Sequence, residues 1–530
     1  MESRSGRVLI RPASVALLPN AHVEQVLSRG TLDFVEEVAV KFQPQLLALL
    51  VERERIEQRL NTSQDVPRFR PDTAHIRADG SWKASSASTY AQRLRRACTV
   101  HVVVPVDDLS LFRSAWASSA DGLQVDFDDA HAPSWLSSIT AQAELARCCQ
   151  EADPTSPLLI MRPRSLHMFE EHVTMDGAPV SGALWDALLF LFANGHRLQS
   201  SDCNGPFFYI PKLENQEEAR WWNDVFEYVE MRLGLVPLSI QCIVLIENVL
   251  AAFECEEILF ALRHRCVGLN SGKFDYIFSI IRKFHRRPEF LLPPRSQLHS
   301  NHEFFRTHLD ILVAACVRRG AIPTTGMWPH LVTSNDNLQM AYGAKLGEAR
   351  AGSLGALVAH VGFIEPVRKA FRDGSKSTSQ RHLELMETWQ LPTAPFLAGI
   401  EKSLLTMPRG FTVRPDDLEH NISVVVGLAN AWSQGRGVAR CRDLLEDLAT
   451  AEICRSLLWQ WIRYRAVMES GQTITRQVVA EHAHRIANGS TGLSIVHAII
   501  QSDTFIPFLS DLLAPLLPGS ISRITRASNL

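Results

Sequence analysis

The chain has 530 residues, 46% of them hydrophobic, and its 54 basic and 57 acidic residues give a net charge of −3. This length and composition predict a large core and more than one domain. The near-neutral charge argues against a nucleic-acid partner, and no apolar stretch is long enough to span a bilayer. No secretory signal opens the sequence, and ten scattered cysteines without a CxxC pair indicate a reducing compartment. We expect a soluble protein with no membrane partner.

Apolar residues near helical spacing predict a helix over residues 31–60. The polar stretch 61–88 contains Pro67, Pro71 and Gly80, which favours a linker or loop. We therefore place an N-terminal helical clasp and linker at residues 1–92.

From about residue 95, short apolar runs alternate with helical patterns. The runs cover residues 99–106, 123–128, 158–162, 242–247, 265–269 and 321–323. Alternating strands and helices argue for a parallel sheet, and at least six strands favour a β/α barrel. We predict an α/β fold with a TIM-type (β/α)8 barrel over residues 93–395. The active site of such a barrel lies at the carboxyl ends of its strands.

Charged residues follow these predicted strands, namely Asp126, Asp128, Arg162 and Glu247. A carboxylate at the end of an apolar run is costly to bury unless it is paired or binds a metal. Glu247 and Asp275 would supply the hard oxygen ligands that Mg²⁺ prefers. Structural alternatives stay open, because Glu247 could form a salt bridge, Asp275 could cap a helix or turn, and Arg162 could pair with Asp126.

Beyond about residue 395 the strand patterns fade. Helical patterns cover residues 444–465, 475–486 and 492–500, which predicts a helical C-terminal domain over 396–530. The chain ends in Ser528-Asn529-Leu530, which is similar to the peroxisomal Ser-Lys-Leu address with asparagine in place of the basic residue.

Four ordered motifs carry a resemblance to a known family. The first is Asp-Phe-Asp-Asp from Asp126, ahead of Pro-Ser-Trp, and the second is Arg-Pro-Arg from Arg162. The third lies within residues 251–278 and contains Gly-Leu-Asn-Ser-Gly-Lys-Phe-Asp-Tyr. The fourth is Leu-Glu-Asp-Leu-Ala-Thr-Ala-Glu-Ile at 445–453. Together they resemble malate synthase, A type, over about residues 30–510.

The resemblance implies a glyoxylate-cycle enzyme that converts acetyl-CoA, glyoxylate and water to malate and CoA with Mg²⁺. It implies Glu247 and Asp275 as the metal ligands, and Arg162 as the group that stabilises the developing alkoxide. Asp447 would be the base that removes a methyl proton from acetyl-CoA. Without the resemblance, the sequence around Asp447 would indicate an ordinary amphipathic helix.

The resemblance also implies which residues bind and support the substrate. The turn with Gly272, Phe274 and Asp275 would offer backbone N–H groups to the glyoxylate carboxylate, and Gly272 permits a backbone geometry that other residues resist. Asp126 and Asp128 would support the site, with Asp128 at a position where the family usually has glutamate.

Departures from the family pattern keep two alternatives open. Phe274 replaces the usual tryptophan, and Leu357 and Val361 replace a tryptophan and a proline in a region near the family's acetyl-CoA pocket. One alternative is a related Mg-dependent acyl-CoA lyase or thioesterase acting on a different acyl-CoA. The other is a non-catalytic peroxisomal matrix protein that retains the barrel.

The location of the protein depends on the C-terminal tripeptide. If Ser528-Asn529-Leu530 is a working address, an import receptor is a partner and the protein is peroxisomal or glyoxysomal. Otherwise we expect it in the cytoplasm. The sequence leaves a homo-oligomer open.

Overall fold

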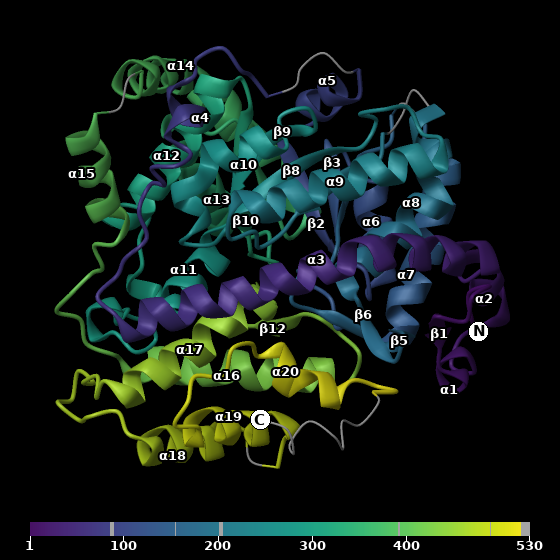
Figure 1. Ribbon diagram of the computed structural model, residues 1–530. Helices are drawn as coiled ribbons and strands as arrows, with labels where there is room; N and C mark the ends of the chain where they lie inside the picture. Colours follow the sequence, from purple (N-terminus) through teal and green to yellow (C-terminus); the bar gives the residue numbers. More distant parts are fainter. Residues whose placement is uncertain (85–88, 154, 201–204, 391–392, 488, 521–530) are drawn as a thin grey trace.

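The structure is a computed structural model that describes residues 1–520 except 85–88, 154, 201–204, 391–392 and 488 (Figure 1). Its centre is a closed barrel of eight parallel strands, in which β11 pairs with β2. The barrel strands are β2 (Val100–Pro105), β3 (Gly122–Asp126), β4 (Leu158–Arg162), β7 (Phe207–Ile210), β8 (Gln241–Ile246), β9 (Cys266–Ser271), β10 (Ile322–Trp328) and β11 (Gly355–Val358). The predicted barrel is confirmed.

Most barrel strands are buried on both faces, since helices cover the outside and side chains fill the inside. This explains why they appear in the sequence as continuous apolar runs rather than as alternating patterns. Strands β7 and β11 were not predicted from the sequence. Each has only four residues, which is too short to give a clear period.

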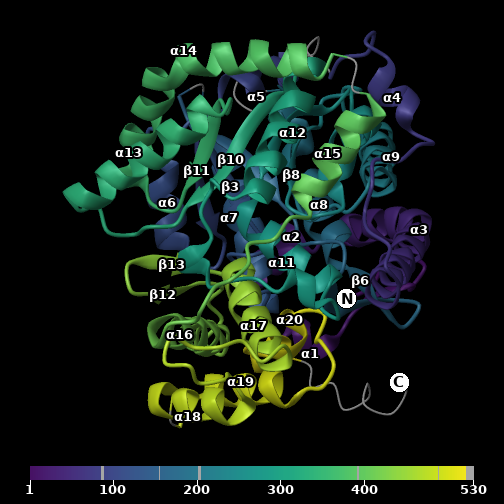
Figure 2. The same cartoon turned by 90° about the vertical axis from the view of Figure 1, so that its left-hand side faces the viewer.

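Helices between the strands surround the barrel (Figures 1 and 2). They are α6 (Leu109–Trp116), α7 (Trp135–Glu151), α8 (Gly182–Ser200), α9 (Gln216–Leu233), α10 (Cys255–Ala261), α11 (Lys273–Lys283), α12 (Glu303–Arg319), α13 (Asn335–Arg350) and α14 (Ile364–Thr388). Local signals set their ends. For example, Asn215 accepts a hydrogen bond from the N–H of Glu218 at the start of α9, and Gly234 ends it in the left-handed conformation.

The N-terminal part is attached to the side of the barrel. The predicted helix is α3 (Arg29–Thr62), which packs on α8 and α9, and a buried ion pair of 2.6 Å joins Arg53 to Glu218. Short helices precede and follow it, and strand β1 joins an antiparallel sheet formed by an insertion after β4. These elements are α1 (Pro12–Val15), α2 (Asn20–Val26), α4 (Ala74–Ala78), α5 (Thr89–Arg96), β1 (Val8–Ile10), β5 (Phe169–Met175) and β6 (Ala178–Ser181). The predicted linker therefore contains α4, which is only five residues long.

Helices α16 to α20 gather at one end of the barrel (Figures 1 and 2). They are α16 (Pro415–Trp432), α17 (Leu448–Arg463), α18 (Arg476–Ala487), α19 (Thr491–Gln501) and α20 (Ser510–Leu513), whereas α15 (Ala394–Leu404) lies beside the barrel and packs on α12. Helix α17 packs on α11 of the barrel and on α16. The helix predicted from residue 444 starts four residues later, because β13 (Leu444–Glu446) pairs with β12 (Ala439–Cys441) and Asp447 caps α17.

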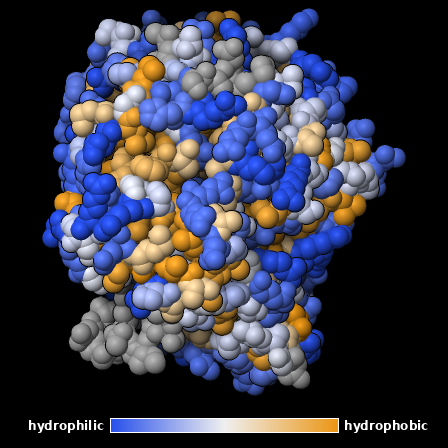
Figure 3. Space-filling view, turned by 90° about the vertical axis from the view of Figure 1, so that its right-hand side faces the viewer, coloured by the Kyte–Doolittle hydropathy of each residue, from blue (hydrophilic) through white to orange (hydrophobic). Residues whose placement is uncertain are grey.

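Within the described part of the chain, no helix is both long and apolar enough to cross a membrane. One face of the molecule has groups of hydrophobic side chains bordered by hydrophilic ones (Figure 3). The tripeptide Ser528-Asn529-Leu530 lies outside the described residues.

Candidate active site

A cavity of about 150 Å³ opens at the carboxyl ends of the barrel strands. Asp126 is the last residue of β3, Arg162 is the last residue of β4, and Glu247 directly follows β8. Asp275 lies in the first turn of α11, and Asp447 enters from the C-terminal helices. All five line this cavity, as do Gly272 and Phe274. The structure thus brings together the predicted residues from distant parts of the sequence.

Arg162 is the buried centre of an acidic cluster. Its Nη1 donates to Asp126 at 3.0 Å, and its Nη2 donates to Asp129 at 2.6 Å and lies 3.5 Å from Glu247. Burial lowers the pKa of Arg162, but these carboxylates outweigh the effect and hold the pKa well above its ordinary value. The ion pair with Asp126 that the sequence left open is therefore present, while the buried Nε has no hydrogen-bond partner among the described residues.

Asp128 contacts the acidic cluster but does not line the cavity. It accepts hydrogen bonds from the N–H and the hydroxyl of Ser165, and it lies 3.1 Å from Arg162. Burial opposes ionisation of Asp128, but Lys212 and Arg162 outweigh it and hold its pKa far below the ordinary range. Arg164 points elsewhere, where it pairs with Asp186 at 2.7 Å.

Lys212 was not predicted from the sequence, and Asp129 was given no role. Lys212 follows β7, and its Nζ donates to Asp128 at 2.6 Å and to Asp129 at 2.7 Å. A lysine two positions after the apolar run Phe207–Ile210 was the available signal, but that strand was not predicted. Asp129 was visible as the last aspartate of the motif that begins at Asp126.

Asp447 is the N-cap residue of α17. Its Oδ1 accepts from the N–H of Thr450 at 3.0 Å, and the next residue, Leu448, donates its N–H to the carbonyl of Asp129 at 3.0 Å. The backbone thus joins the C-terminal helices to the strand end that carries the acidic motif. Burial, with Asp129 nearby, raises the pKa of Asp447 to about 7, which suits a base that works near neutral pH.

Glu247 and Asp275 each keep one oxygen free. Oε1 of Glu247 accepts from the N–H of Lys212 at 2.9 Å, whereas Oε2 has no partner in the described part of the chain. The buried Oδ1 of Asp275 has none there either. Burial raises the pKa of both carboxyls, and Asp129 adds to the rise in each. Both are hard oxygen donors, and a bound cation would favour the ionised form of each carboxyl against this rise in pKa.

The residues present fit a divalent cation. Carboxylates outnumber cations in the cluster around Arg162 and Lys212, which face Asp126, Asp128, Asp129, Glu247, Asp275 and Asp447, and they still do when Lys273, Lys345 and Glu348 of the same cavity are added. A dication would offset this excess. Among the described residues no group of three or more His, Cys, Asp or Glu side chains is arranged to hold a metal. Two carboxylate ligands with the remaining positions left to substrate and water are nevertheless a usual Mg²⁺ arrangement.

Gly272 is needed for space rather than for its backbone angles. It precedes α11 with φ −84° and ψ 89°, which other residues also adopt, so the conformational reason expected from the sequence was wrong. A Cβ on Gly272 would lie 2.5 Å from Cβ and 2.6 Å from Oε2 of Glu247. The bare glycine therefore leaves room for the Glu247 carboxylate.

Replacing Gly272 with alanine should displace Glu247 and weaken Mg²⁺ binding by about 10- to 100-fold, the usual effect of disturbing a ligand's support. Calorimetric titration of the metal-stripped protein with MgCl₂ measures this. Gly343→Ala is the matched control, because nothing lies within 4 Å of its added Cβ. An unchanged affinity in Gly272→Ala would remove the argument that this glycine protects the ligand.

Of the two residues that depart from the family pattern near the expected coenzyme site, one lines the cavity and the other does not. Leu357, in β11, lines the cavity, whereas Val361 begins a short 3-10 turn at Val361–Phe363 and is not among the lining residues. Phe274 is partly buried, and the Arg295 guanidinium lies 5.6 Å from its ring centre.

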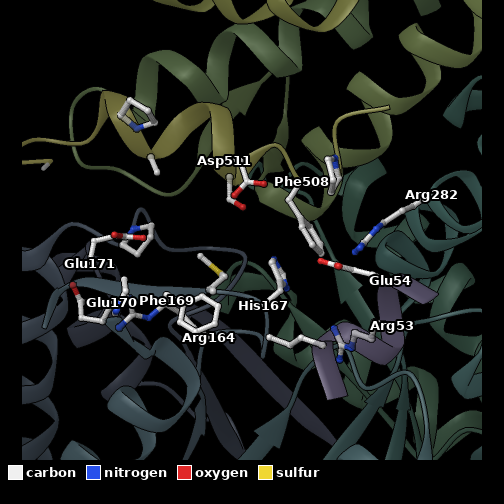
Figure 4. Close-up of a pocket in the computed structure, with 18 of the residues that line it drawn as sticks. Arg53, Glu54, Arg164, His167, Phe169, Glu170, Glu171, Arg282, Phe508 and Asp511 are labelled. Carbon is white, nitrogen blue, oxygen red and sulfur yellow. Dashed lines mark hydrogen bonds and ion pairs between the residues drawn. The ribbon is translucent and has the colours of Figure 1, made fainter. Parts of the chain in front are cut away.

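A larger cavity of about 910 Å³ lies between α3, the segment after β4, α11 and the C-terminal residues 507–520. Figure 4 shows His167 and Arg282 near Phe508, and the His167 ring stacks on that of Phe508 at 3.5 Å. None of the predicted catalytic or metal-binding residues lines this cavity. The smaller cavity with the acidic cluster is therefore the candidate active site.

Comparisons with known proteins show the family of this chain. Family models described as "Malate synthase, TIM barrel domain" and "Malate synthase, C-terminal" match residues 158–393 and 412–505. A solved structure of Haloferax volcanii malate synthase in a ternary complex with pyruvate and acetyl-CoA is 13% identical to this chain. It has a TM-score of 0.50 and covers 79% of this chain and 100% of that chain, which supports the fold.

Three curated relatives extend over most of this chain. Malate synthase of Myxococcus xanthus is 34% identical over 470 residues, which cover 85% of this chain and 84% of the relative. Glyoxysomal malate synthase of Brassica napus is 32% identical over 491 residues, with 87% and 85% covered. The bifunctional glyoxylate cycle protein of Caenorhabditis elegans is 33% identical over 486 residues, and the match spans 87% of this chain but only 49% of that longer protein. This chain belongs to the malate synthase family.

Proposed function

We propose that this chain is a Mg²⁺-dependent enzyme of the glyoxylate cycle that condenses acetyl-CoA with glyoxylate and water to give malate and CoA. One observation carries the proposal. Asp447, a buried carboxyl whose pKa is raised to about 7, lines the same small cavity as Arg162, Glu247 and Asp275, whose buried Oδ1 has no partner among the described residues.

Asp447 starts the reaction as the base. Its carboxylate takes a proton from the acetyl methyl group, and the resulting enolate carbon forms a bond with the aldehyde carbon of glyoxylate. The C=O π electrons move to the aldehyde oxygen, and this alkoxide takes up a proton to become the hydroxyl group. Water then adds to the thioester carbonyl, the C–S bond breaks, and CoA leaves as the thiol. The N-cap hydrogen bond from Thr450 fixes the direction of the Asp447 side chain. The backbone hydrogen bond from Leu448 to Asp129 fixes the distance of Asp447 from the barrel.

Arg162 stabilises the negative charge that develops on the aldehyde oxygen. Asp126 and Asp129 hold its two Nη groups, so the plane of the guanidinium cannot rotate freely. Its buried Nε–H remains unused among the described residues and can donate to an incoming oxygen.

Glu247 and Asp275 would hold the metal through Oε2 and Oδ1. When bound, Mg²⁺ supplies a Lewis acid that polarises the carbonyl of glyoxylate. The first turn of α11, from Gly272, presents backbone N–H groups and the positive end of the helix dipole to the glyoxylate carboxylate. Asp126 and Asp128 keep the arginine in place.

The alternatives have less support. A related lyase acting on another acyl-CoA would not need Asp447, yet the C-terminal helices bring this residue into the cavity. A non-catalytic protein would not need Asp447 and Arg162 to line one cavity with free oxygens of Glu247 and Asp275.

We also propose a cellular location and a domain organisation for the chain. A peroxisomal or glyoxysomal location, with an import receptor as partner, is supported by Ser528-Asn529-Leu530 and by the name of the Brassica napus relative. The division is an N-terminal clasp and linker at 1–92, the barrel at 93–395 and the C-terminal domain at 396–530.

The purified protein should release CoA thiol only when acetyl-CoA, glyoxylate and Mg²⁺ are all present. Each component is left out in turn as the control. Release without glyoxylate would indicate a thioesterase, and release with another 2-oxo acid or acyl-CoA only would indicate a related lyase. A folded protein that releases nothing with any of them would support the non-catalytic alternative.

A further inference from the structure

Lys212 has a backbone conformation that calls for an explanation. Its φ is 51°, in the left-handed region that is disfavoured for residues with a Cβ. Glycine or asparagine would adopt this conformation more easily. A strained residue persists only where its surroundings hold it, and such residues gather at functional sites.

The backbone and the side chain of Lys212 both donate hydrogen bonds to the acidic cluster. Its backbone N–H donates to Oε1 of Glu247 at 2.9 Å, while its Nζ donates to Asp128 and Asp129 at 2.6 and 2.7 Å. Glycine could supply the backbone contact but not the ammonium group. The side chain therefore explains why lysine is present at a strained position.

The same ammonium group also lies close to Asp275, the second proposed metal ligand. Nζ lies 3.4 Å from Oδ2 of Asp275, whose Oδ1 is the oxygen left without a partner in the described residues. A positive charge this close to Glu247 and Asp275 repels any other cation that binds there, and the repulsion is strong because the site is buried. Lys212 is 14% exposed in its side chain, so solvent screens it little.

We propose that Lys212 is a positioning residue that balances the charge of the metal-free site and competes with the divalent cation for it. The inference rests on the proposed function, because it takes Glu247 and Asp275 as metal ligands. Lys212 keeps the carboxylates together when the metal is absent, and it weakens metal binding in return. It thereby makes the metal exchangeable without loss of the site's geometry.

The test is calorimetric titration of metal-stripped protein with MgCl₂, without substrates. Lys212→Met removes the charge but keeps the chain length and the backbone N–H to Glu247. We expect Lys212→Met to bind Mg²⁺ at least tenfold more tightly than the wild type. We also expect its metal-free form to unfold at a lower temperature, with a larger rise on adding MgCl₂.

Two further variants serve as controls. Lys345→Met removes another buried lysine of the same cavity, which pairs with Glu348 at 2.9 Å, and it should leave the Mg²⁺ affinity within threefold of wild type. The double variant Lys212→Met with Asp128→Asn restores the net charge, and its asparagine can still accept from Ser165. The Mg²⁺ affinity of the double variant should also return to within threefold of wild type. If Lys212→Met alone does not fold, the double variant tests the proposal in its place.

The outcomes separate this inference from the proposed function. A wild type that does not bind Mg²⁺ would contradict the proposed metal site itself. A wild type that binds, beside a folded Lys212→Met variant with equal or weaker affinity, would overturn the competing role of Lys212 and leave the metal site standing. A double variant outside the threefold range would overturn it as well.

Discussion

Replacing Asp447 with asparagine should lower kcat by about 10²- to 10⁴-fold, the usual contribution of a general base. Asparagine cannot accept the methyl proton, but its side-chain oxygen can still accept from the N–H of Thr450 and cap α17. CoA release measures kcat, and NMR in D₂O follows the loss of methyl protons from acetyl-CoA. Both rates should fall together.

Asp447→Ala separates the base from the cap. It should lose as much activity as Asp447→Asn and, in addition, about 1 kcal/mol of stability, because the N-cap acceptor is gone. Asp443→Asn, at an exposed position just upstream, should keep wild-type activity. If Asp447→Asn kept more than a tenth of wild-type turnover, another group would have to be the base.

The same substitution of asparagine for Asp447 should stabilise the metal-free protein at pH 8. The pKa of Asp447 is raised from 3.8 to about 7 in the fold, so ionising this carboxyl costs stability. The cost is absent below about pH 4, grows as the pH rises from 3.8 to about 7, and is complete above that. The Asp447→Asn variant has no such cost, since an asparagine side chain does not ionise.

Urea unfolding in EDTA, at pH 5 and at pH 8, measures this difference. The free energy of unfolding of Asp447→Asn minus that of the wild type should increase by about 3 kcal/mol between the two pH values. Asp443→Asn should give the same difference at both. An Asp447→Asn difference that does not change with pH would contradict the raised pKa.

The sequence predicted the barrel because most strands are long, apolar and separated by helical patterns. It could not predict β7 and β11, since four buried residues give no period that distinguishes a strand from part of a helix. Missing β7 also meant missing a site residue. Lys212 follows β7, and a charged residue is recognised as a candidate site residue only where the end of a strand is predicted.

The arrangement of the acidic cluster was also beyond the sequence. The motifs gave Asp126, Arg162 and Glu247 at strand ends and Asp275 in a turn, but not which oxygens are shared and which stay free. Likewise the glycine at 272 is explained by a close approach to a side chain 25 positions earlier, which no local pattern contains. Such facts depend on how the strands are placed around the barrel.

Replacing Arg162 with lysine should lower kcat by about 10²- to 10³-fold, as expected when one donor to a developing oxyanion is lost. The charge remains, so the buried carboxylates keep a counter-ion and the protein should fold. A single ammonium group cannot hold Asp126 and Asp129 in one plane and also donate to the substrate. The KM for glyoxylate should change less than kcat, because the loss is in the transition state.

Arg164→Lys is the matched control, since it makes the same change in an arginine two positions away. Arg164 is equally buried and pairs with Asp186 and Glu170 at 2.7 and 3.0 Å, outside the acidic cluster. Arg164→Lys should therefore lower the free energy of unfolding while kcat stays within a few-fold of wild type. If both variants lost stability and activity to the same degree, Arg162 would be a structural ion pair, the alternative that its sequence context left open. A loss of kcat confined to Arg162→Lys separates the two, because a purely structural ion pair would lose turnover only in step with stability.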